Sequence, residues 1–407
     1  MNAIPFARPS IGPAEIDAVS RVLRSGWLTT GEQALAFERE FAAAVGSRHA
    51  LAVNSATAGL HLALEAVGVG PGDSVIVPSM TFTATAEVVR YLGAEVVFAD
   101  VSPGTLLIDP TDVRTRAAAT VAGGGRVAAI VPVHLAGETC DIPGLRAVAE
   151  EFGAALIEDA AHAFPGSAHG AALGTHGDAG VFSFYANKTI TTGEGGMVVT
   201  DRDDIADRIR TMRSHGIDRE AWHRYTAAGT TTSITETPHW YYEVVAPGYK
   251  YNLPDTAAAL GRVQLRRATE LREARYRCAR RYLDGLSDLA ADGIVALPGD
   301  LPGHAWHLFV LRVLPAGGRA PGGGAVDRDA LIAALRGRGI GTSVHYIPLH
   351  HMPYWRDRYP EAVGRLPETD RAFREIVSLP LYPDLSESDQ AHVIAALREL
   401  LGAHRGE

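Results

Sequence analysis

The sequence predicts an α/β fold, in which a mostly parallel seven-stranded sheet with helices around it precedes a smaller α+β domain. Short runs of apolar and β-branched residues recur through the first 200 residues, and helical patterns separate several of them. These runs are continuously apolar, as in strands that are buried on both faces. After residue 200 the pattern changes to long helices with few strands, which is typical of an α+β arrangement.

The first half begins with two helical segments, Ile16–Leu23 and Phe37–Val45, whose apolar residues share one face. Helices are also expected at Ala58–Val67 and Ile142–Phe152. The seven expected strands are Ala50–Val53, Val75–Pro78, Glu95–Phe98, Val127–Val133, Ala154–Ile157, Gly180–Phe184 and Met197–Thr200.

The second half begins with a charged helix, Asp204–Arg213, and a polar, aromatic stretch around Thr230–Tyr242. The elements expected after it are a long helix over Asp255–Leu286, a strand over Trp306–Leu314, a glycine-rich surface loop over Gly317–Gly324, a helix over Asp327–Arg338, a strand over Thr342–Ile347 and a last helix over Glu387–Leu401. At roughly 100–200 residues per domain, we predict two domains, residues 1–254 and 255–407.

Composition excludes several classes of protein. The chain has 407 residues, 46% of them hydrophobic, and a formal net charge of −9, which argues against a nucleic-acid partner. No apolar run approaches the roughly 20 residues that span a bilayer, and the N-terminus lacks a secretory signal pattern. The two cysteines, Cys140 and Cys278, are too few for a disulfide scaffold. We therefore expect a cytoplasmic protein of enzyme size.

Lys188 is the most informative single residue. It follows the strand Gly180–Phe184 and precedes the glycine turn Gly193–Gly196, in a chain whose other positive charges are mostly arginine. On this fragment alone, an exposed loop lysine is the simpler interpretation. The functional interpretation is an amine nucleophile that forms a Schiff base, which requires partial desolvation.

Other notable residues also follow strands, where open α/β sheets bind their ligands. Asp159 ends a strand and either caps a helix or pairs with a protonated ring nitrogen. His162, by itself, is more typical of a structural histidine. The small residues of Asn54–Gly59 open a helix and expose N–H groups suited to phosphate, although capping alone also favours serine and threonine there. Phe82 is either core or a surface on which a ring stacks.

Three further patterns receive no functional assignment. Gly68–Gly72 precedes its strand and contains proline, so it is a turn and not a dinucleotide fingerprint. His345, His350 and His351 have no carboxylate or cysteine at a recognised spacing, and we expect no metal site. The sequence contains neither a Gly-x-Ser-x-Gly elbow nor a Walker loop.

A phosphate-binding helix start, a stacking ring, a carboxylate and a lysine thus follow four separate strands of one predicted sheet. Pyridoxal 5'-phosphate (PLP) requires such protein groups, namely a lysine for the Schiff base and an acid for the pyridinium nitrogen. The residues therefore predict a PLP site.

The chain resembles the DegT/DnrJ/EryC1/StrS family of PLP-dependent sugar aminotransferases, which have the fold-type I aminotransferase architecture. The resemblance covers nearly the whole chain, and the order and spacing of its short segments make it specific. Those segments are Ile4–Pro9, Ser25–Gly31, Asn54–Leu64, Glu158–Ala163, Phe182–Lys188, Gly193–Thr200 and Gly248–Leu253.

The resemblance implies a role for each matching residue. Lys188 would be the catalytic residue and form the Schiff base. The other cofactor contacts implied are Thr57, Ala58 and Ser183 at the phosphate, Phe82 on the ring, Asp159 at the ring nitrogen and His162 beside it. Substrate contacts are expected from loops that include Trp27, Thr29, His345 and Tyr346.

Family members are usually homodimers in which the segment matching Gly248–Leu253 completes the active site of the partner subunit. Many members read Gly-Tyr-Asn-Tyr-Arg there, whereas this chain reads Gly-Tyr-Lys-Tyr-Asn. We take Asn252 as the contact to the phosphate across the subunits.

The implied reaction moves an amino group from L-glutamate to a keto sugar. The Lys-Tyr-Asn-Leu form is most similar to the branch that aminates nucleotide-linked 4-keto sugars, either 4-keto-6-deoxy sugars or 4-keto pentoses. Alternatives are a keto-cyclitol substrate, as in aminoglycoside pathways, and a PLP-binding regulatory protein. Dehydratases of the same family replace the lysine with histidine, so Lys188 argues against that activity. The Ala-, Arg- and Gly-rich composition is consistent with a GC-rich genome and with antibiotic biosynthesis.

Overall fold

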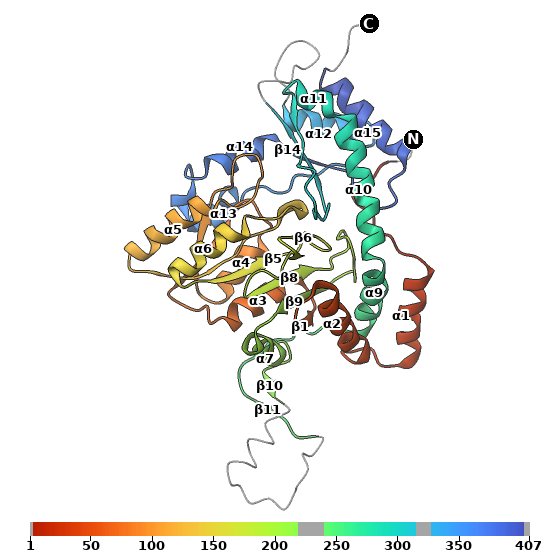
Figure 1. The fold of residues 1–407 in the computed structure, drawn as a ribbon. Coiled ribbons are helices and arrows are strands. Elements are labelled where there is room, and N and C mark those ends of the chain that lie inside the picture. Colours follow the sequence, from red (N-terminus) through yellow and green to blue (C-terminus); the bar gives the residue numbers. More distant parts are fainter. Residues whose placement is uncertain (1–2, 219–239, 315–326, 403–407) are drawn as a thin grey trace, which may run out of the picture.

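The computed structural model describes residues 3–218, 240–314 and 327–402, so the Gly317–Gly324 loop and most of Thr230–Tyr242 lie outside the described residues. A seven-stranded sheet lies at the centre of the molecule, in the strand order β1-β9-β8-β5-β4-β2-β3 (Figure 1). Its strands are β1 (His49–Val53), β2 (Asp73–Pro78), β3 (Glu95–Ala99), β4 (Arg126–Ile130), β5 (Ala155–Asp159), β8 (Ala179–Ser183) and β9 (Gly196–Thr200).

The sheet is mostly parallel, as predicted. Strand β9 pairs antiparallel with β1 and β8, whereas the β2–β3, β2–β4, β4–β5 and β5–β8 pairs are parallel. All seven predicted strands are present, each displaced by at most a few residues. The carboxyl ends of β1, β2, β5 and β8 therefore meet at one edge of the sheet, where ligands bind in such folds.

Helices cover both faces of the sheet, so neighbouring residues of one strand enter different cores. Val75 and Val77 of β2 pack in the core beneath α3, α4 and α7, whereas Ile76 packs with α5 and α6. The helices of this part are α1 (Pro13–Ser25), α2 (Glu32–Val45), α3 (Ala56–Ala66), α4 (Ala84–Tyr91), α5 (Pro110–Ala122), α6 (Ile142–Phe152) and α7 (Asp203–Met212), with the short helix η1 (Leu135–Gly137). Two further pairs of short antiparallel strands are β6 (Ser167–Ala168) with β7 (Ala171–Ala172), and β10 (Ile217–Asp218) with β11 (Glu243–Val244).

The C-terminal part builds a second core around the three-stranded sheet β12-β13-β14, with Tyr282, Phe309 and Leu335 buried in it. Its elements are α9 (Asp255–Arg266), α10 (Ala268–Gly285), α11 (Ser287–Ala291), β12 (Val295–Ala296), β13 (Phe309–Val313), α12 (Arg328–Gly337), η2 (Leu349–His351), α13 (Pro353–Arg358), η3 (Pro360–Ala362), α14 (Pro367–Glu375), β14 (Ile376–Leu379) and α15 (Glu387–Leu400).

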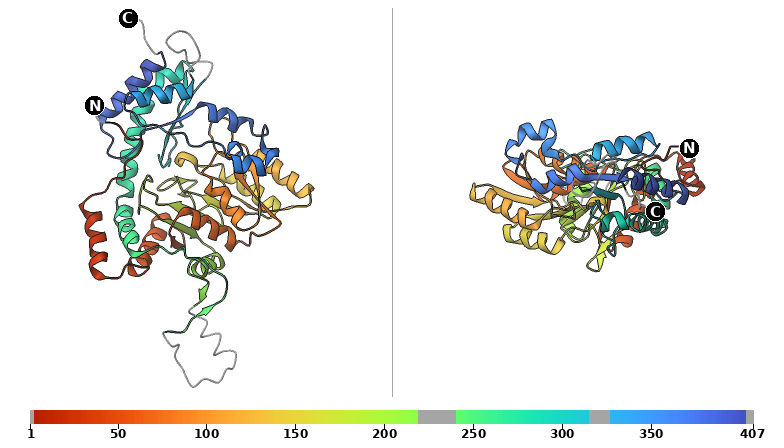
Figure 2. Two further views of the ribbon diagram at one scale, coloured as in Figure 1. Left: turned by 180° about the vertical axis from the view of Figure 1, so that it is seen from behind. Right: turned by 90° about the horizontal axis from the view of Figure 1, so that it is seen from above.

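Two predictions for this part are wrong. The long helix over Asp255–Leu286 is divided at Arg267, where α9 ends against α1 and α2, and α10 continues toward the small sheet (Figures 1 and 2). The periodicity runs through the junction, so the sequence pattern does not reveal it. The segment Thr342–Ile347 is not a strand, because a single bridge joins Ser343 to Ser378 and the chain then turns toward the large sheet.

A division into two domains near residue 255 stays a proposal, because segments from each half pack in the hydrophobic core of the other half. Leu349, Trp355 and Tyr359 pack in the core of the large sheet, whereas Ile4 packs in the core of the small one. The N-terminal segment and the 349–366 segment thus each join the core of the other half. None of the described helices combines the length and apolar character needed to span a bilayer.

Candidate active site

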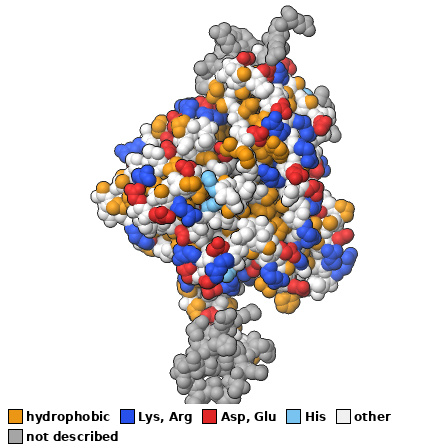
Figure 3. All heavy atoms as spheres, in the orientation of Figure 1, with side chains coloured by type: hydrophobic (Ala, Val, Ile, Leu, Met, Phe, Trp, Pro, Cys, Tyr) orange, Lys and Arg blue, Asp and Glu red, His pale blue; other side chains and the backbone are white. Residues whose placement is uncertain are grey.

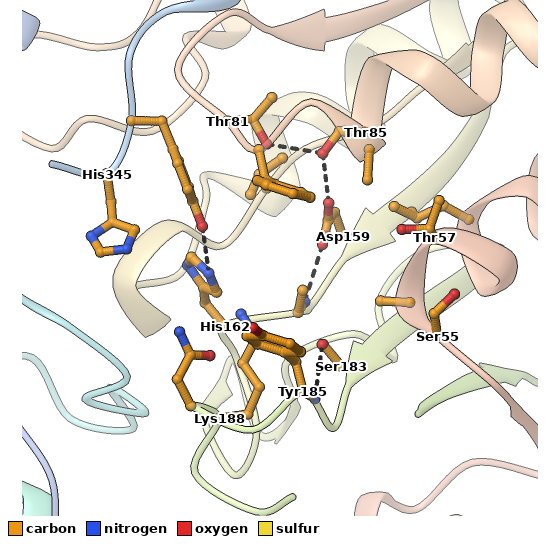
Figure 4. A pocket seen from close by; sticks show the side chains of 18 of the residues that line it. Ser55, Thr57, Thr81, Thr85, Asp159, His162, Ser183, Tyr185, Lys188 and His345 are labelled. Carbon is orange, nitrogen blue, oxygen red and sulfur yellow. Dashed lines mark hydrogen bonds between the residues drawn. The ribbon is translucent and has the colours of Figure 1, made fainter. Parts of the chain in front are cut away.

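A cavity of about 470 Å³ lies at the carboxyl edge of the large sheet. Its walls come from the segments that follow β1, β2, β5 and β8, together with residues 345 and 346 (Figure 4). The sequence-predicted residues that line it are Thr57, Phe82, Asp159, His162, Ser183, Lys188, His345 and Tyr346.

Lys188 lies in the turn after β8, where its backbone N–H donates to Tyr185 O (3.0 Å). Its Nζ lies 3.5 Å from His307 Nε2, which belongs to the C-terminal half. Burial is the main cause that lowers the pKa of Lys188 to about 7, and the positive charge of Arg275 acts in the same direction, whereas Asp159 opposes both. At neutral pH a large fraction of this amine is unprotonated, as a nucleophile requires.

Asp159 ends β5 and is buried at the floor of the cavity. Its Oδ2 accepts a hydrogen bond from Thr85 Oγ1 (2.8 Å), and its Oδ1 accepts one from Ala161 N–H (3.1 Å). Burial raises the pKa of this carboxyl, although both hydrogen bonds oppose that shift. No described residue forms an ion pair with Asp159, although the charges of Lys188 and His134 act on it from a greater distance, so its buried carboxylate is available to a cationic group of a ligand.

The start of α3 provides an anion-binding wall. Ser55 caps the helix, since its Oγ accepts the N–H of Ala58 (3.0 Å), and the N–H groups of Ala56 and Thr57 have no partner among the described residues. Gly196 of β9 passes this turn so closely that a Cβ there would lie 2.8 Å from Ala56 N. The two free N–H groups at the helix N-terminus suit a phosphate.

His162 and Tyr346 form one side of the cavity. His162 Nδ1 accepts the Ala136 N–H (3.2 Å), and His162 Nε2 lies 3.1 Å from the Tyr346 hydroxyl. Burial lowers the pKa of His162 well below its usual value, so the ring is neutral. The ring of His307 packs on His162 with 4.3 Å between centroids.

Phe82 and His345 complete the walls. Phe82 is 58% exposed, which excludes the core interpretation, and its ring lies 6.0 Å from that of Tyr346. His345 Nδ1 is hydrogen-bonded to Ser378 Oγ (2.8 Å), and burial lowers its pKa to about 4. The exposed face of Phe82 is available for a planar ring.

Four sequence-predicted residues do not line this cavity. Ala58 is buried in α3, and its N–H is taken by Ser55, so the free donors are one and two residues earlier. Asn252 Nδ2 donates to Thr30 Oγ1 (2.6 Å), beside the loop that carries Trp27 and Thr29. Trp27 is 60% exposed and lines a separate groove between α1 and α2.

A carboxylate that the sequence spacing does not reveal lies beside two of these histidines, His350 and His351. Asp370 Oδ1 lies 2.8 Å from His350 Nε2 and 2.7 Å from His351 Nε2, and the three groups are close enough to share an ion. His350 Nδ1 also bonds Ser79 Oγ (2.7 Å), so hydrogen bonds already account for its ring. These contacts tie the segment after Tyr346 to the end of β2.

Sequence reasoning missed three residues that shape the site. Thr85 holds Asp159, and its spacing of four from Thr81 at the start of a helix was the available signal. His307 and Arg275 approach Lys188 from the C-terminal half, where no local pattern linked them to it. Such contacts depend on the packing of the two halves.

The cavity fits PLP. A buried carboxylate without an ion-pair partner among the described residues, free N–H groups at a helix start and an amine with a lowered pKa border one cavity, as the ring nitrogen, phosphate and aldehyde of PLP require (Figure 4). The aromatic face of Phe82 offers the stacking surface.

Comparisons with known proteins agree with this chemistry. The sequence model of the DegT/DnrJ/EryC1/StrS aminotransferase family matches residues 9–398. The spore coat polysaccharide biosynthesis protein SpsC of Bacillus subtilis (strain 168) is 43% identical over 401 residues, which are 98% of this chain and 97% of SpsC. The solved structure of the aminotransferase TlmJ from Streptoalloteichus hindustanus is 33% identical, with a TM-score of 0.84 over 99% of this chain and all of TlmJ. That of DesV from S. venezuelae is 32% identical, with a TM-score of 0.83 over 100% of both chains.

Fold and cavity together define a PLP-dependent transaminase of fold type I. The chain belongs to the DegT/DnrJ/EryC1/StrS aminotransferase family, and it is a sugar aminotransferase.

Proposed function

We propose that the enzyme moves an amino group from L-glutamate to the 4-keto group of a nucleotide-linked sugar, either a 4-keto-6-deoxy sugar or a 4-keto pentose. The observation that carries the transfer is that Lys188 and Asp159 face one cavity, with free N–H groups at its end. The segment Gly248–Leu253 supports the choice of substrate through its similarity to the 4-keto branch. The name of SpsC points to polysaccharide biosynthesis, which is consistent with an amino-sugar product.

Different residues of this chain bind different parts of the cofactor. PLP, when bound, supplies an electron sink for the carbanion. Asp159 keeps the ring nitrogen protonated, because a close opposite charge favours the charged form of its partner. Ser183 and the N–H groups of Ala56 and Thr57 hold the phosphate, and Phe82 covers one face of the ring.

Lys188 is the acid–base group of this proposal. Its Nζ would take the proton from the carbon that carries the donor nitrogen and pass it to the cofactor, and in the second half of the reaction it would carry a proton from the cofactor to the keto carbon of the sugar. A pKa of about 7 suits both tasks, because an efficient proton carrier populates both of its forms near the working pH.

We also propose that the active enzyme is a homodimer. The described residues that line the cavity include no arginine, and their one lysine, Lys188, is assigned to catalysis, so they offer no further lysine or arginine for the phosphate. A dianionic phosphate therefore favours additional donors from a second copy, and Asn252, which lies outside the cavity of its own chain, is the proposed contact. Trp27 and Thr29 lie in the loop beside Asn252 and are proposed to reach the substrate in the same way.

The attachment of the cofactor can be tested with unusual precision, because Lys188 and Lys250 are the only lysines in the sequence. Borohydride reduction of the loaded enzyme should fix the label on the peptide that contains Lys188. Lys188→Ala should bind PLP without that label and lose turnover by at least a factor of 1,000. Labelling of Lys250, or turnover of Lys188→Ala near that of the wild type, would contradict the assignment.

The substrate is tested in the reverse direction, with 2-oxoglutarate as the amino acceptor. Nucleotide-linked 4-amino sugars should yield glutamate, whereas free amino sugars and an amino-cyclitol should not. Preference for the amino-cyclitol would replace the nucleotide-sugar proposal. Conversion of the cofactor absorbance by L-glutamate alone separates a catalyst from a regulatory protein that only binds PLP.

A further inference from the structure

Tyr346 lines the cavity next to His162 and Phe82 and comes from the segment that follows α12. Its backbone N–H donates to Met80 Sδ (3.4 Å), which holds this segment against the end of β2. The hydroxyl lies 3.1 Å from His162 Nε2, drawn as the dashed line at His162 in Figure 4. The direction of this hydrogen bond decides what the hydroxyl can do for a ligand.

The direction follows from the other nitrogen of His162. A backbone N–H can only donate, so His162 Nδ1, which lies 3.2 Å from Ala136 N, accepts and carries no hydrogen. The ring is neutral, so its one hydrogen is on Nε2. Nε2–H therefore donates to the oxygen of Tyr346.

Tyr346 then keeps its own hydrogen for another acceptor. Burial and the nearby Asp159 raise the pKa of this phenol, so the hydroxyl stays protonated. No described residue accepts its hydrogen bond, and the side chain borders the cavity. A buried hydroxyl hydrogen without an acceptor is costly, which favours a partner inside the cavity.

We propose that Tyr346 donates a hydrogen bond to a negatively charged or carbonyl oxygen of the bound ligand, with His162 orienting the hydroxyl. Two oxygens could accept this hydrogen bond. One is the phenolic oxygen attached to the pyridine ring of the cofactor, called the ring oxygen below, and the other is an oxygen of the sugar. A neutral donor stabilises developing negative charge on such an oxygen without reorganising during the reaction. The inference requires a PLP-dependent site, and it deepens the proposed function by naming a contact to its ligands.

Tyr346→Phe removes the hydroxyl and keeps the ring, so the fold is expected to persist. If the acceptor is the ring oxygen, the midpoint of the pH titration of the cofactor absorbance should shift by about one pH unit without any sugar present. If the acceptor belongs to the sugar, that titration stays as in the wild type and kcat/KM for the sugar falls at least tenfold. Tyr354→Phe is the matched control, since Tyr354 is 58% exposed and does not line the cavity.

Absence of both effects in Tyr346→Phe overturns the proposal. The hydrogen-bond direction is tested separately by ¹⁵N NMR of the histidine rings, with the His162 signals assigned from His162→Gln. A hydrogen on Nε2 is expected, and one on Nδ1 would overturn the argument. The cofactor titration and the NMR experiment need no turnover, so they stand even if the proposed sugar is wrong.

Discussion

Lys188 is held by the C-terminal half as well as by its own turn. Arg275 of α10 is buried and donates to the carbonyl oxygens of Asn187 (3.4 Å), His307 (3.2 Å) and Leu381 (2.9 Å). Among the described residues it forms no ion pair with a carboxylate, so its charge acts on the amine nearby. The same contact therefore fixes the position of Lys188 and helps to lower its pKa.

This environment makes the capture of PLP by the cofactor-free enzyme depend on pH in a specific way. An amine attacks only in its unprotonated form, and the pKa of about 7 lies below the ordinary 10.5. The rate should rise as the pH increases through 7 and be nearly constant above about 8. Stopped-flow absorbance from pH 6 to 10 measures it. Nα-acetyl-lysine amide, which offers only an ordinary side-chain amine, is the control and should continue to gain rate up to about pH 10. An enzyme rate that does the same would contradict the lowered pKa.

Among the elements, α2 depends on a residue far away in the chain. Asp255, the first residue of α9, accepts hydrogen bonds from the N–H groups of Gly31 (2.7 Å), Gln33 (3.1 Å) and Ala34 (3.0 Å). A carboxylate at a helix N-terminus satisfies free donors and interacts favourably with the helix dipole. Asp255 thus joins α9 to α2 and fixes the end of the Trp27–Gly31 loop.

Asp255→Ala should lower the free energy of unfolding by about 2 kcal/mol, because three N–H groups at a helix start lose a charged acceptor. Chemical denaturation monitored by circular dichroism measures the change. Asp284→Ala is the control, since Asp284 forms an exposed i,i+4 pair with Arg280 that is worth about 0.5 kcal/mol or less. If both substitutions lower the free energy of unfolding equally, the hydrogen bonds of Asp255 at the start of α2 stabilise the fold no more than an exposed ion pair does.

The elements differ in how well the sequence predicts them. The strands of the large sheet are short, continuously apolar and bounded by turn residues, so local pattern identifies all seven. The break at Arg267 is invisible locally, because the junction depends on α9 packing against α1 and α2 and on Arg267 bonding Glu15. Thr342–Ile347 has the composition of a strand, yet only one bridge, at Ser343, joins it to β14, and the backbone N–H of Tyr346 donates instead to Met80 beyond the end of β2.

At the scale of the whole molecule, the net charge of −9 does not describe the site. Positive and negative side chains are interspersed on the face shown in Figure 3. The anionic ligands are met instead by local donors, such as the helix start at Ala56 and Thr57. The net charge of the chain argues against a nucleic-acid partner, whereas the local arrangement of donors in a site determines which small anions bind there.

Exposed apolar side chains on α1 and in the loop after it suit the proposed homodimer. Ile16 and Leu23, seven residues apart on one face of α1, are 59% and 56% exposed. Replacing both with arginine should change the mass in solution from two chains to one and reduce turnover, because the site would lose donors from the second copy. Light scattering after gel filtration measures the mass.

Val121→Arg is the control for that experiment, since Val121 is 49% exposed on α5, away from α1. It should leave the mass of two chains unchanged. A wild-type protein that is monomeric and fully active would contradict the shared site. A dimer that persists after both arginines are introduced would show that the interface lies elsewhere.

Local periodicity and residue chemistry at strand ends are sufficient to predict the fold class and the strands of the large sheet, and they place a lysine and a carboxylate at the ends of two of its strands. Only the packing of distant segments places Thr85 against Asp159, Arg275 and His307 around Lys188, and the hydroxyl of Tyr346 beside His162. Each of these contacts joins segments that are distant in the chain. Their geometry, and the pKa values that depend on burial, arise only when the two halves pack together.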